Sequence, residues 1–410
     1  MPSLLRRNPS FRRLWAAGAV SLVGDWLSLV AVATLATTSG GGALGRALVF
    51  AAHALPAALF APFAGVIVDS FDRRRVLIVA DAGAAIVTVG MVACALAGAP
   101  LAIPLLVLVR SAITSIVPPG ESAAVRVLVA EGDLLPANAI LAATWSVAFV
   151  VGMALGGLAA MLGPALALAL DAGSFVLAAI LHASLPALPV TAPPRSLGAV
   201  VRATPRDTVH ALRVAARTPR LLAAMLGKSP LGLAGGAGWI ALNLLAAEAQ
   251  PFGPTALSFG LLQAIRGAGT GIGPAIASRL RGRGVSDVRL QAYAVTAALV
   301  AITGLAVTRS PIALALAALV WGVGTGANWV LAHTSLQQHA GEDVIGRLAA
   351  FDELLVTSAM VFSAFVGAVV FDAGGLAAVP LLGSALGLVG VVAVGLAILL
   401  SRRASLARSR

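Results

Sequence analysis

Residues 45–68 read GRALVFAAHALPAALFAPFAGVIV, residues 69–75 read DSFDRRR, and residues 76–97 read VLIVADAGAAIVTVGMVACALA. Each apolar run is close to the length of about 20 residues that a helix needs to cross a bilayer. The short gap between the two runs ends in three consecutive arginines. Apolar runs and polar gaps alternate in this way along nearly the whole chain, so the sequence predicts a polytopic, all-α membrane protein.

Composition supports this class, because hydrophobic residues make up 59% of the 410 positions and charged residues only 11%. A soluble domain carries roughly 25% charged residues. Three polar breaks pair a capping residue with a proline that suits the first helical turn, namely Asn8-Pro9, Thr218-Pro219 and Ser310-Pro311. The twelve predicted spans lie near residues 14–37, 45–68, 75–97, 101–122, 139–161, 164–186, 219–245, 255–279, 287–308, 311–336, 347–371 and 375–400.

The basic residues predict the orientation of the chain. With the N-terminus in the cytoplasm, 23 of the 28 lysines and arginines fall on the cytoplasmic side, and only Arg46 and Arg309 fall in outer loops. The other three, Arg110, Lys228 and Arg266, lie inside spans. Cytoplasmic loops are enriched in basic residues, so both termini are expected in the cytoplasm. This bias also explains the formal net charge of +12 without a nucleic-acid partner.

The longest polar stretch divides the spans six and six. The predicted domains are an N-terminal half at 1–186, a cytoplasmic linker at 187–218 and a C-terminal half at 219–410. The linker is interpreted either as an amphipathic helix on the inner membrane surface or as a solvated basic segment. Gaps in the two halves resemble each other at an offset of about 210 residues, and such six-span repeats are common among secondary transporters.

The stretch GVIVDSFDRR at residues 65–74 resembles a loop of the major facilitator superfamily, whose pattern is Gly-x-x-x-Asp-Arg-x-Gly-Arg-Arg. Ser70 and Asp72 depart from the pattern. The resemblance implies a cytoplasmic gate in which an arginine pairs with an acid near the end of span 4, here Glu121. A plain basic loop is the alternative interpretation. The residues that match the pattern are Gly65, Asp69, Arg73 and Arg74.

Further stretches resemble the drug and siderophore exporter branch, whose members exchange substrate for protons. Residues 8–15, NPSFRRLW, are similar to the opening of that subgroup, and Arg110 is similar to its span-4 arginine. A span-5 motif, Gly-Pro-x-x-Gly-Gly, is matched with Met153 in place of the proline. The resemblance implies two pseudo-symmetric six-helix halves, and the small residues of span 5 predict close helix packing. These small residues are Gly152, Gly156 and Gly157.

Ionisable residues deep within spans are costly and usually mark function. Asp25 and Arg110 lie near the middle of spans 1 and 4, and their opposite charges predict an ion pair. That pair is interpreted either as the proton-coupling site or as a permanent structural contact. Lys228 is expected to reach the membrane interface with its side chain, and Asp81 to join the charges of the gate. The lower-ranked candidates for proton coupling or for the cavity are Asp171, Arg266 and Glu353.

The expected function is proton-coupled efflux of amphipathic or hydrophobic small molecules by alternating access. Export of one metabolite or siderophore is an alternative, and a non-transporting membrane partner protein is an alternative of another class. The expected partners are a small-molecule substrate, protons and the bilayer of the cell membrane, and a monomer is expected. Neither catalytic cluster, Walker motif nor cofactor or metal motif is found, so an enzyme is not expected. The glycines of residues 267–273 predict close helix packing instead of nucleotide binding, because no strand precedes them.

Overall fold

The structure is a computed structural model that describes residues 2–38, 41–189, 197–341 and 344–408. Within these ranges the regular secondary structure is entirely helical. By its internal contacts the chain forms two compact units. Unit 1 comprises Met1–Val200 and Phe252–Ala264, and unit 2 comprises Val201–Pro251 and Ile265–Arg410.

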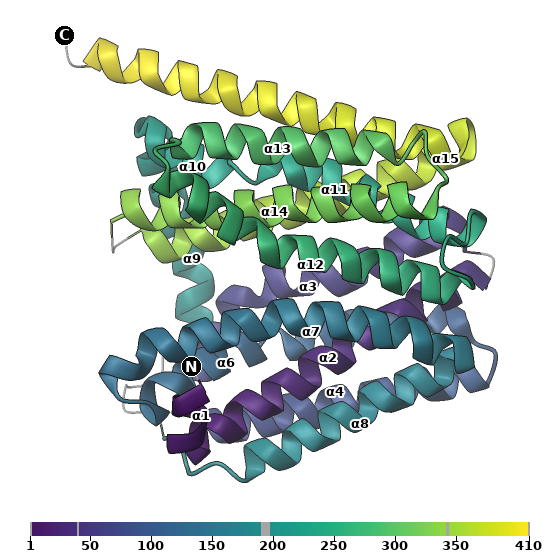
Figure 1. The fold of residues 1–410 in the computed structure, drawn as a ribbon. Coiled ribbons are helices and arrows are strands. Elements are labelled where there is room, and N and C mark those ends of the chain that lie inside the picture. Colours follow the sequence, from purple (N-terminus) through teal and green to yellow (C-terminus); the bar gives the residue numbers. More distant parts are fainter. Residues whose placement is uncertain (1, 39–40, 190–196, 342–343, 409–410) are drawn as a thin grey trace. The chain divides into compact units, whose positions relative to one another are not determined.

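In unit 1, helix α8 packs against α4 and α2, and α2 also packs against α7 (Figure 1). This arrangement places helices that are distant in the sequence beside one another. The elements of this unit are α1 (Pro2–Arg7), α2 (Pro9–Thr38), α3 (Gly42–Ser70), α4 (Arg73–Leu96), the 3-10 turn η1 (Pro100–Ala102), α5 (Ile103–Thr114), α6 (Val117–Leu128), η2 (Glu131–Asp133), α7 (Leu134–Leu162) and α8 (Pro164–Ala183).

In unit 2, α11 packs along α15, and α13 packs against α14 (Figure 1). Helix α12 contributes its first residues to unit 1 and the rest to unit 2. The elements are α9 (Leu197–Arg217), α10 (Pro219–Leu226), α11 (Ser229–Glu248), α12 (Thr255–Gly282), α13 (Asp287–Gly304), α14 (Pro311–His339) and α15 (Ile345–Arg408).

Nine helices of the described part of the chain are long and apolar enough to cross a membrane. One of them, α15, contains the last two predicted spans, which are separated by a non-helical residue, Gly375. Two further predicted spans correspond to α12 and α13, which are more polar helices outside those nine. Each of the twelve predicted spans therefore coincides with helical structure, and the all-α membrane fold is confirmed.

Helices begin at the three predicted proline starts, but the capping chemistry differs among them. The Asn8 side chain accepts a hydrogen bond from the Phe11 backbone N–H at 2.9 Å, as an N-cap residue should. Thr218 and Ser310 occupy the N-cap positions of α10 and α14 without forming a side-chain cap bond. The predicted capping is thus confirmed at Asn8 only, and elsewhere the proline alone marks the helix start.

Two predicted spans are interrupted near their middle. Span 4 consists of α5 and α6, which separate just before Pro118 and Pro119, because proline lacks an N–H donor and clashes with the preceding turn. Span 7 consists of α10 and α11, which separate at Gly227 and Lys228. The Asn328 side chain donates to the Gly227 carbonyl at 3.0 Å. A neighbouring helix thereby satisfies a carbonyl at the interruption, as membrane proteins require.

The predicted linker contains helix α9, whose last turns are packed within unit 2. Ala211 and Ala215 are buried in one apolar cluster with residues of α10, α14 and the 344–348 segment. The Ser401 hydroxyl also donates to the Ala216 carbonyl at 2.8 Å. A wholly solvated linker does not describe this part of α9. Residues 190–196 of the predicted linker lie outside the described residues, and the domain boundaries at 187 and 218 stay a prediction.

Glycines allow several helices to approach with their backbones nearly touching. A Cβ atom at Gly152 would lie 2.6 Å from the Trp26 Cβ of α2, and one at Gly156 would lie 2.6 Å from the Leu27 carbonyl oxygen. A Cβ at Gly157 would lie 3.0 Å from the Ala256 carbonyl oxygen in α12. In unit 2, Gly269 and Gly273 bring α12 against the α14 backbone. The expectation of close packing is therefore confirmed for that glycine series.

Candidate transport site and gate

The centre of unit 1 holds a buried arginine between two acids. The Arg110 side chain in α5 is fully buried, and its Nη2 atom lies 2.8 Å from Oδ1 of Asp25 in α2. Its Nη1 atom lies 2.5 Å from Oδ2 of Asp171 in α8. The contact with Asp25 does not meet hydrogen-bond geometry despite its short distance, so it is an ion pair without an aligned N–H. The predicted partner of Arg110 is present, and a second acid accompanies it.

Small polar side chains position this cluster. Ser28 lies one turn after Asp25 and accepts a hydrogen bond from Arg110 Nη1 at 2.8 Å. Ser174 lies one turn after Asp171 and donates to the Asp171 backbone carbonyl at 2.7 Å. A Cβ at Gly24 would lie 2.7 Å from Asp171 Oδ1, so glycine leaves the space that this carboxylate occupies. The Arg110 cluster, defined as Asp25, Arg110 and Asp171, is thus fixed from three helices.

The two acids differ in their access to solvent. Asp171 has no exposed side-chain surface, whereas 21% of the Asp25 side chain is exposed. One guanidinium faces two carboxylates, so the cluster carries an excess negative charge when both acids are ionised. Burying an uncompensated charge is strongly unfavourable. The geometry therefore favours neutralisation of one of the two acids.

An aromatic group lies beside Asp25. The Trp26 ring lies 4.6 Å from the Phe149 ring and 5.4 Å from the His53 ring, measured between centroids. Trp145 stacks on Phe149 at 5.9 Å. Trp26 Nε1 and His53 Nδ1 are buried and have no hydrogen-bond partner among the described residues. The tryptophans give no periodic signal in the sequence.

The remaining predicted coupling residues lie in unit 2, in two separate contacts. The Arg266 guanidinium carbon lies 5.0 Å from the centroid of the Trp321 ring, within cation–π range. Glu353 belongs to a second charged group, in which Lys228 Nζ lies 3.8 Å from Glu353 and 2.5 Å from Asp352. Lys228 is buried, so the expectation that it reaches the interface is wrong. An acid within the unit neutralises it instead.

The predicted gate loop contacts the end of α8. Arg73 Nη1 donates to the Pro189 carbonyl at 3.0 Å, and the Arg73 backbone N–H donates to the Leu188 carbonyl at 3.2 Å. The Arg74 guanidinium donates to the Ala183 carbonyl. Asp69 is exposed at the end of α3, and a Cβ at Gly65 would meet no atom within 4 Å.

The expected pairing of a loop arginine with Glu121 is wrong. No ion pair joins Arg73 or Arg74 to Glu121 in the part of the chain that the structure describes. Both arginines find backbone carbonyls after α8 instead. Glu121 lies in the first turns of α6, with Oε1 buried against Gly18 of α2. The family pattern located both partners but not the carbonyl groups that compete for the arginines.

Asp72, which departs from the family pattern, has a structural role that sequence reasoning missed. Its Oδ1 atom accepts from the Arg75 backbone N–H at 3.0 Å and caps α4. Its Oδ2 atom accepts from the Leu188 backbone N–H, also at 3.0 Å. An Asp immediately before a helical run is an N-cap signal that the sequence does contain. The second contact depends on a segment 116 residues away and has no local signal.

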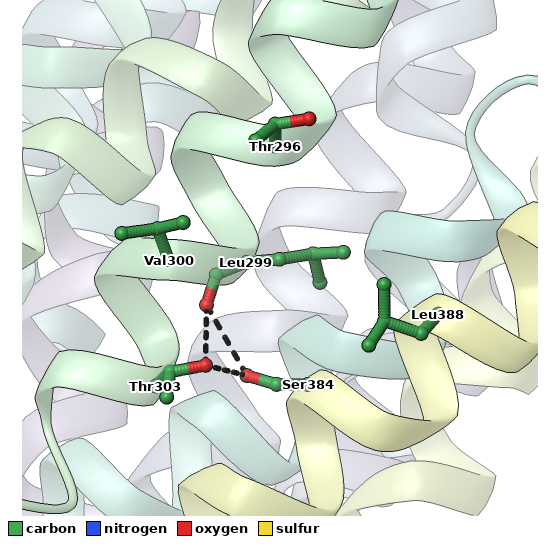
Figure 2. Close-up of a pocket in the computed structure, with 6 residues that line it drawn as sticks. All are labelled: Thr296, Leu299, Val300, Thr303, Ser384 and Leu388. Atoms are coloured by element: carbon green, nitrogen blue, oxygen red, sulfur yellow. Dashed lines mark hydrogen bonds between the residues drawn. The ribbon is translucent and has the colours of Figure 1, made fainter.

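A cavity of about 260 Å³ lies between α13 and α15 of unit 2 (Figure 2). The hydroxyls of Thr303 and Ser384 lie 2.8 Å apart, and each is within hydrogen-bond distance of the Leu299 carbonyl oxygen. These polar groups are satisfied by one another, so they do not direct a polar ligand into the cavity. None of the predicted transport residues lines it. Its lining residues are Thr296, Leu299, Val300, Thr303, Ser384 and Leu388.

Apolar helical spans with buried ionic clusters are typical of multi-pass membrane proteins that move solutes or protons. Solved structures share this fold. A point mutant of the nucleoside transporter NupG aligns with a TM-score of 0.72 at 13% identity, over 94% of this chain and 99% of its own. A bacterial homologue of the human lysosomal transporter Spinster aligns with a TM-score of 0.71 at 14% identity, over 96% of each chain. At such identities the likeness shows the fold alone.

The chain belongs to the transmembrane secretion effector family of the major facilitator superfamily, whose family model matches residues 4–409. It is 27% identical over 185 residues to the uncharacterized MFS-type transporter YfiS of Bacillus subtilis, and 34% identical over 159 residues to the multidrug efflux pump Tap of Mycobacterium tuberculosis. These matches cover 45% and 37% of this chain, and 44% and 38% of the relatives. The matched region is thus less than half of either relative.

Proposed function

We propose that this transporter exports amphipathic or hydrophobic small molecules in exchange for protons, by alternating access. The observation that carries the proposal is the placement of Arg110 between Asp25 and Asp171. One cation and two carboxylates leave one negative charge to be neutralised. A proton neutralises it in one state of the cycle, and departure of that proton leaves a carboxylate that must be compensated otherwise.

Asp25 is the acid at which the proton exchanges in this proposal. It is the only member of the Arg110 cluster with side-chain exposure, at 21%, so a proton can reach it without opening the helix bundle. Asp171 is the positioning acid, because it is fully buried and holds Nη1 of Arg110 at 2.5 Å. The cost of an isolated charge within the membrane region links loss of the proton to the arrival of a compensating group.

Efflux of apolar or amphipathic compounds is supported by two observations. The chain is similar to a multidrug efflux pump over part of its length. In unit 1, Trp26 directly follows Asp25 in the sequence, and its ring contacts the rings of Trp145 and Phe149, which together offer an apolar surface. Aromatic surfaces bind varied ligands through burial and ring contacts without a fixed set of hydrogen bonds.

The test is uptake of a panel of compounds into inverted vesicles or proteoliposomes, with and without an imposed pH gradient. Wild-type protein should accumulate substrate only with the gradient. Asp25→Asn mimics the permanently protonated acid, so it should abolish accumulation and still allow downhill movement, because the site remains intact while its proton carrier is gone. Glu131→Gln is the matched control, since it removes an exposed acid outside the cluster.

Gradient-driven accumulation by Asp25→Asn at the wild-type level would disprove the assignment of Asp25. The compound panel also decides between broad efflux and the export of one metabolite, because the latter transports a single member of the panel. If wild-type protein moves no compound under any gradient, a non-transporting partner role becomes the better explanation.

The gate is supported by the contacts of the loop arginines, and the orientation by the distribution of basic residues along the chain. We infer that both termini are cytoplasmic and that Asp69, Arg73 and Arg74 act at a cytoplasmic gate, where the arginines fasten the end of α8. Val209 in α9 is exposed and offers a labelling position. In a Cys94→Ala background, Val209→Cys should resist an impermeant thiol reagent in intact cells and react after permeabilisation. Labelling in intact cells would reverse the orientation.

A further inference from the structure

A second group of buried ionisable side chains lies in unit 1, away from the Arg110 cluster. Asp81 in α4 and His182 in α8 are fully buried, and Asp81 Oδ2 lies 2.6 Å from His182 Nδ1. Glu121 in α6 lies close enough to Asp81 for the two carboxylates to interact electrostatically. A Cβ at Gly18 of α2 would overlap Glu121 Oε1, so this carboxylate is confined. These three residues, Asp81, Glu121 and His182, are the α4–α6–α8 cluster.

Each member of the α4–α6–α8 cluster has a buried polar atom that is unsatisfied. Asp81 Oδ1, Glu121 Oε1 and His182 Nε2 have no hydrogen-bond partner among the described residues. Buried polar atoms are nearly always paired, so three unpaired atoms in one cluster require an explanation. Carboxylate oxygens and an imidazole nitrogen all accept protons, and a histidine changes charge between about pH 5 and pH 8.

The cluster adjoins a set of contacts that fastens residues 183–189. Arg74 donates to the Ala183 carbonyl, which directly follows His182. Arg13 Nη1 donates to the Ser184 carbonyl at 2.9 Å. Asp72 accepts from the Leu188 backbone N–H at 3.0 Å, and Arg73 donates to the Pro189 carbonyl at 3.0 Å. These contacts are called the α8 clasp, and two of them fasten the residues that directly follow His182.

We propose that the α4–α6–α8 cluster is a proton-binding site, separate from the Arg110 cluster, whose occupancy controls the strength of the α8 clasp. With a proton bound, His182 and Asp81 are held together across α8 and α4. Departure of the proton leaves a negative charge that no cation of the cluster neutralises, and this weakens the hold of α4 on the end of α8. The carbonyls of Ala183 and Ser184 directly follow His182, so their bonds to Arg74 and Arg13 weaken as well.

Charged groups lie on most of the elements packed around the cluster. Helix α7 packs against α8 and carries no titratable side chain. The other titratable groups that face the cluster or the clasp from the packed elements are Arg13 on α2, Asp69 at the end of α3, Asp72 before α4, Arg74 and Asp81 on α4, and Glu121 on α6.

The experiment is hydrogen–deuterium exchange of the full-length protein in nanodiscs, followed on the backbone amides of Leu185, Ala187 and Leu188. Protection factors, corrected for the intrinsic exchange rate, are compared at about pH 6 and about pH 8. In wild-type protein, protection of these amides should fall by about tenfold at the higher pH, which corresponds to one unit of linked proton affinity. His182→Gln should show the same protection at both values.

Two controls separate this effect from a general loss of structure. His339→Gln removes a histidine at the exposed end of α14 and should keep the wild-type pH dependence. Gly18→Ala leaves every titratable group in place but displaces Glu121, so it should shift the pH at which protection falls. Elution as a single monodisperse species shows that each variant is folded.

Wild-type protection that does not change with pH would overturn the proposal, as would a His182→Gln protein with the full wild-type pH dependence. The proposal does not depend on proton-coupled export. Asp25→Asn should lose gradient-driven accumulation and keep the pH dependence of amide exchange. Failure of one proposal is therefore distinguishable from failure of the other.

Discussion

Arg110 in unit 1 and Lys228 in unit 2 each contact two acids, but they hold them differently. Arg110 lies 2.8 Å from Asp25 and 2.5 Å from Asp171. Lys228 lies 2.5 Å from Asp352 but 3.8 Å from Glu353, whose side chain is 53% exposed. Both groups contain one base and two acids. In unit 1 both acids are mostly buried, whereas in unit 2 Glu353 is largely exposed.

The difference follows from the chemistry of the two cations. A guanidinium is a planar fork that serves two carboxylates at once, whereas an ammonium is a compact point charge. Lys228 therefore forms one close pair and leaves Glu353 to solvent, while its ammonium also lies 4.8 Å from the centroid of the Trp329 ring. In this pair of groups, the second acid is held closely only by the forked cation, Arg110.

Replacement of Arg110 should have the largest effect. Arg110→Ala leaves Asp25 and Asp171 without a cation, and removal of one partner of a buried ion pair costs about 3–5 kcal/mol. The apparent melting temperature in detergent should fall by several degrees, and transport should be lost. Arg110→Lys keeps the charge but removes the fork, so it should retain part of the stability and lose gradient-driven accumulation. Equal behaviour of arginine and lysine at this position would remove the basis of the comparison.

Lys228→Ala should have the second-largest effect. It leaves Asp352 buried and unpaired, which should destabilise the protein by about 3 kcal/mol, measured as thermal unfolding in detergent. The double variant Lys228→Met with Asp352→Leu removes both charges and restores apolar packing, so it should recover most of the lost stability. A double variant that is less stable than Lys228→Ala would show that the ion pair itself is required.

Glu353→Gln should have the smallest effect. The acid is half exposed and its ion pair with Lys228 is long, at 3.8 Å, so its removal should change stability by less than about 0.5 kcal/mol. Gradient-driven accumulation should stay near the wild-type level, in contrast to Asp25→Asn. Loss of pH-driven accumulation in Glu353→Gln would indicate that protons are coupled at Lys228 and its acids in unit 2, and not at the Arg110 cluster in unit 1.

The apolar runs and the arginine-rich gaps were sufficient to predict the helices. The first and last residues of the helices were harder to predict, because a proline within an apolar run can begin a new helix as well as bend one. Span 4 was expected as one helix, yet the chain separates into α5 and α6 before Pro118. The apolar run continues through Val117, so it does not mark the point at which the span is interrupted.

Side-chain partners were harder to predict than helices. The pairing of Asp25 with Arg110 was expected from depth and charge, whereas Asp171 ranked lower among the candidates and its contact with Arg110 was not expected. The pairing of Lys228 with Asp352 joins residues 124 positions apart and carries no local signal. The Arg73 side chain donates to a backbone carbonyl instead of pairing with Glu121. Every residue has a backbone carbonyl, so the sequence does not indicate which one an arginine contacts.

Gly375 and Gly18 are glycines for different reasons, and this decides whether another residue can replace them during evolution. Its φ of 71° and ψ of −174° lie in a region that only glycine occupies readily, while a Cβ there would meet no atom within 4 Å. At Gly18 the obstacle is a side chain, so a change at Glu121 can compensate for an added methyl group. No neighbour obstructs Gly375, and therefore no second mutation can repair its loss. The turn between the last two spans should stay glycine while the surrounding sequence drifts.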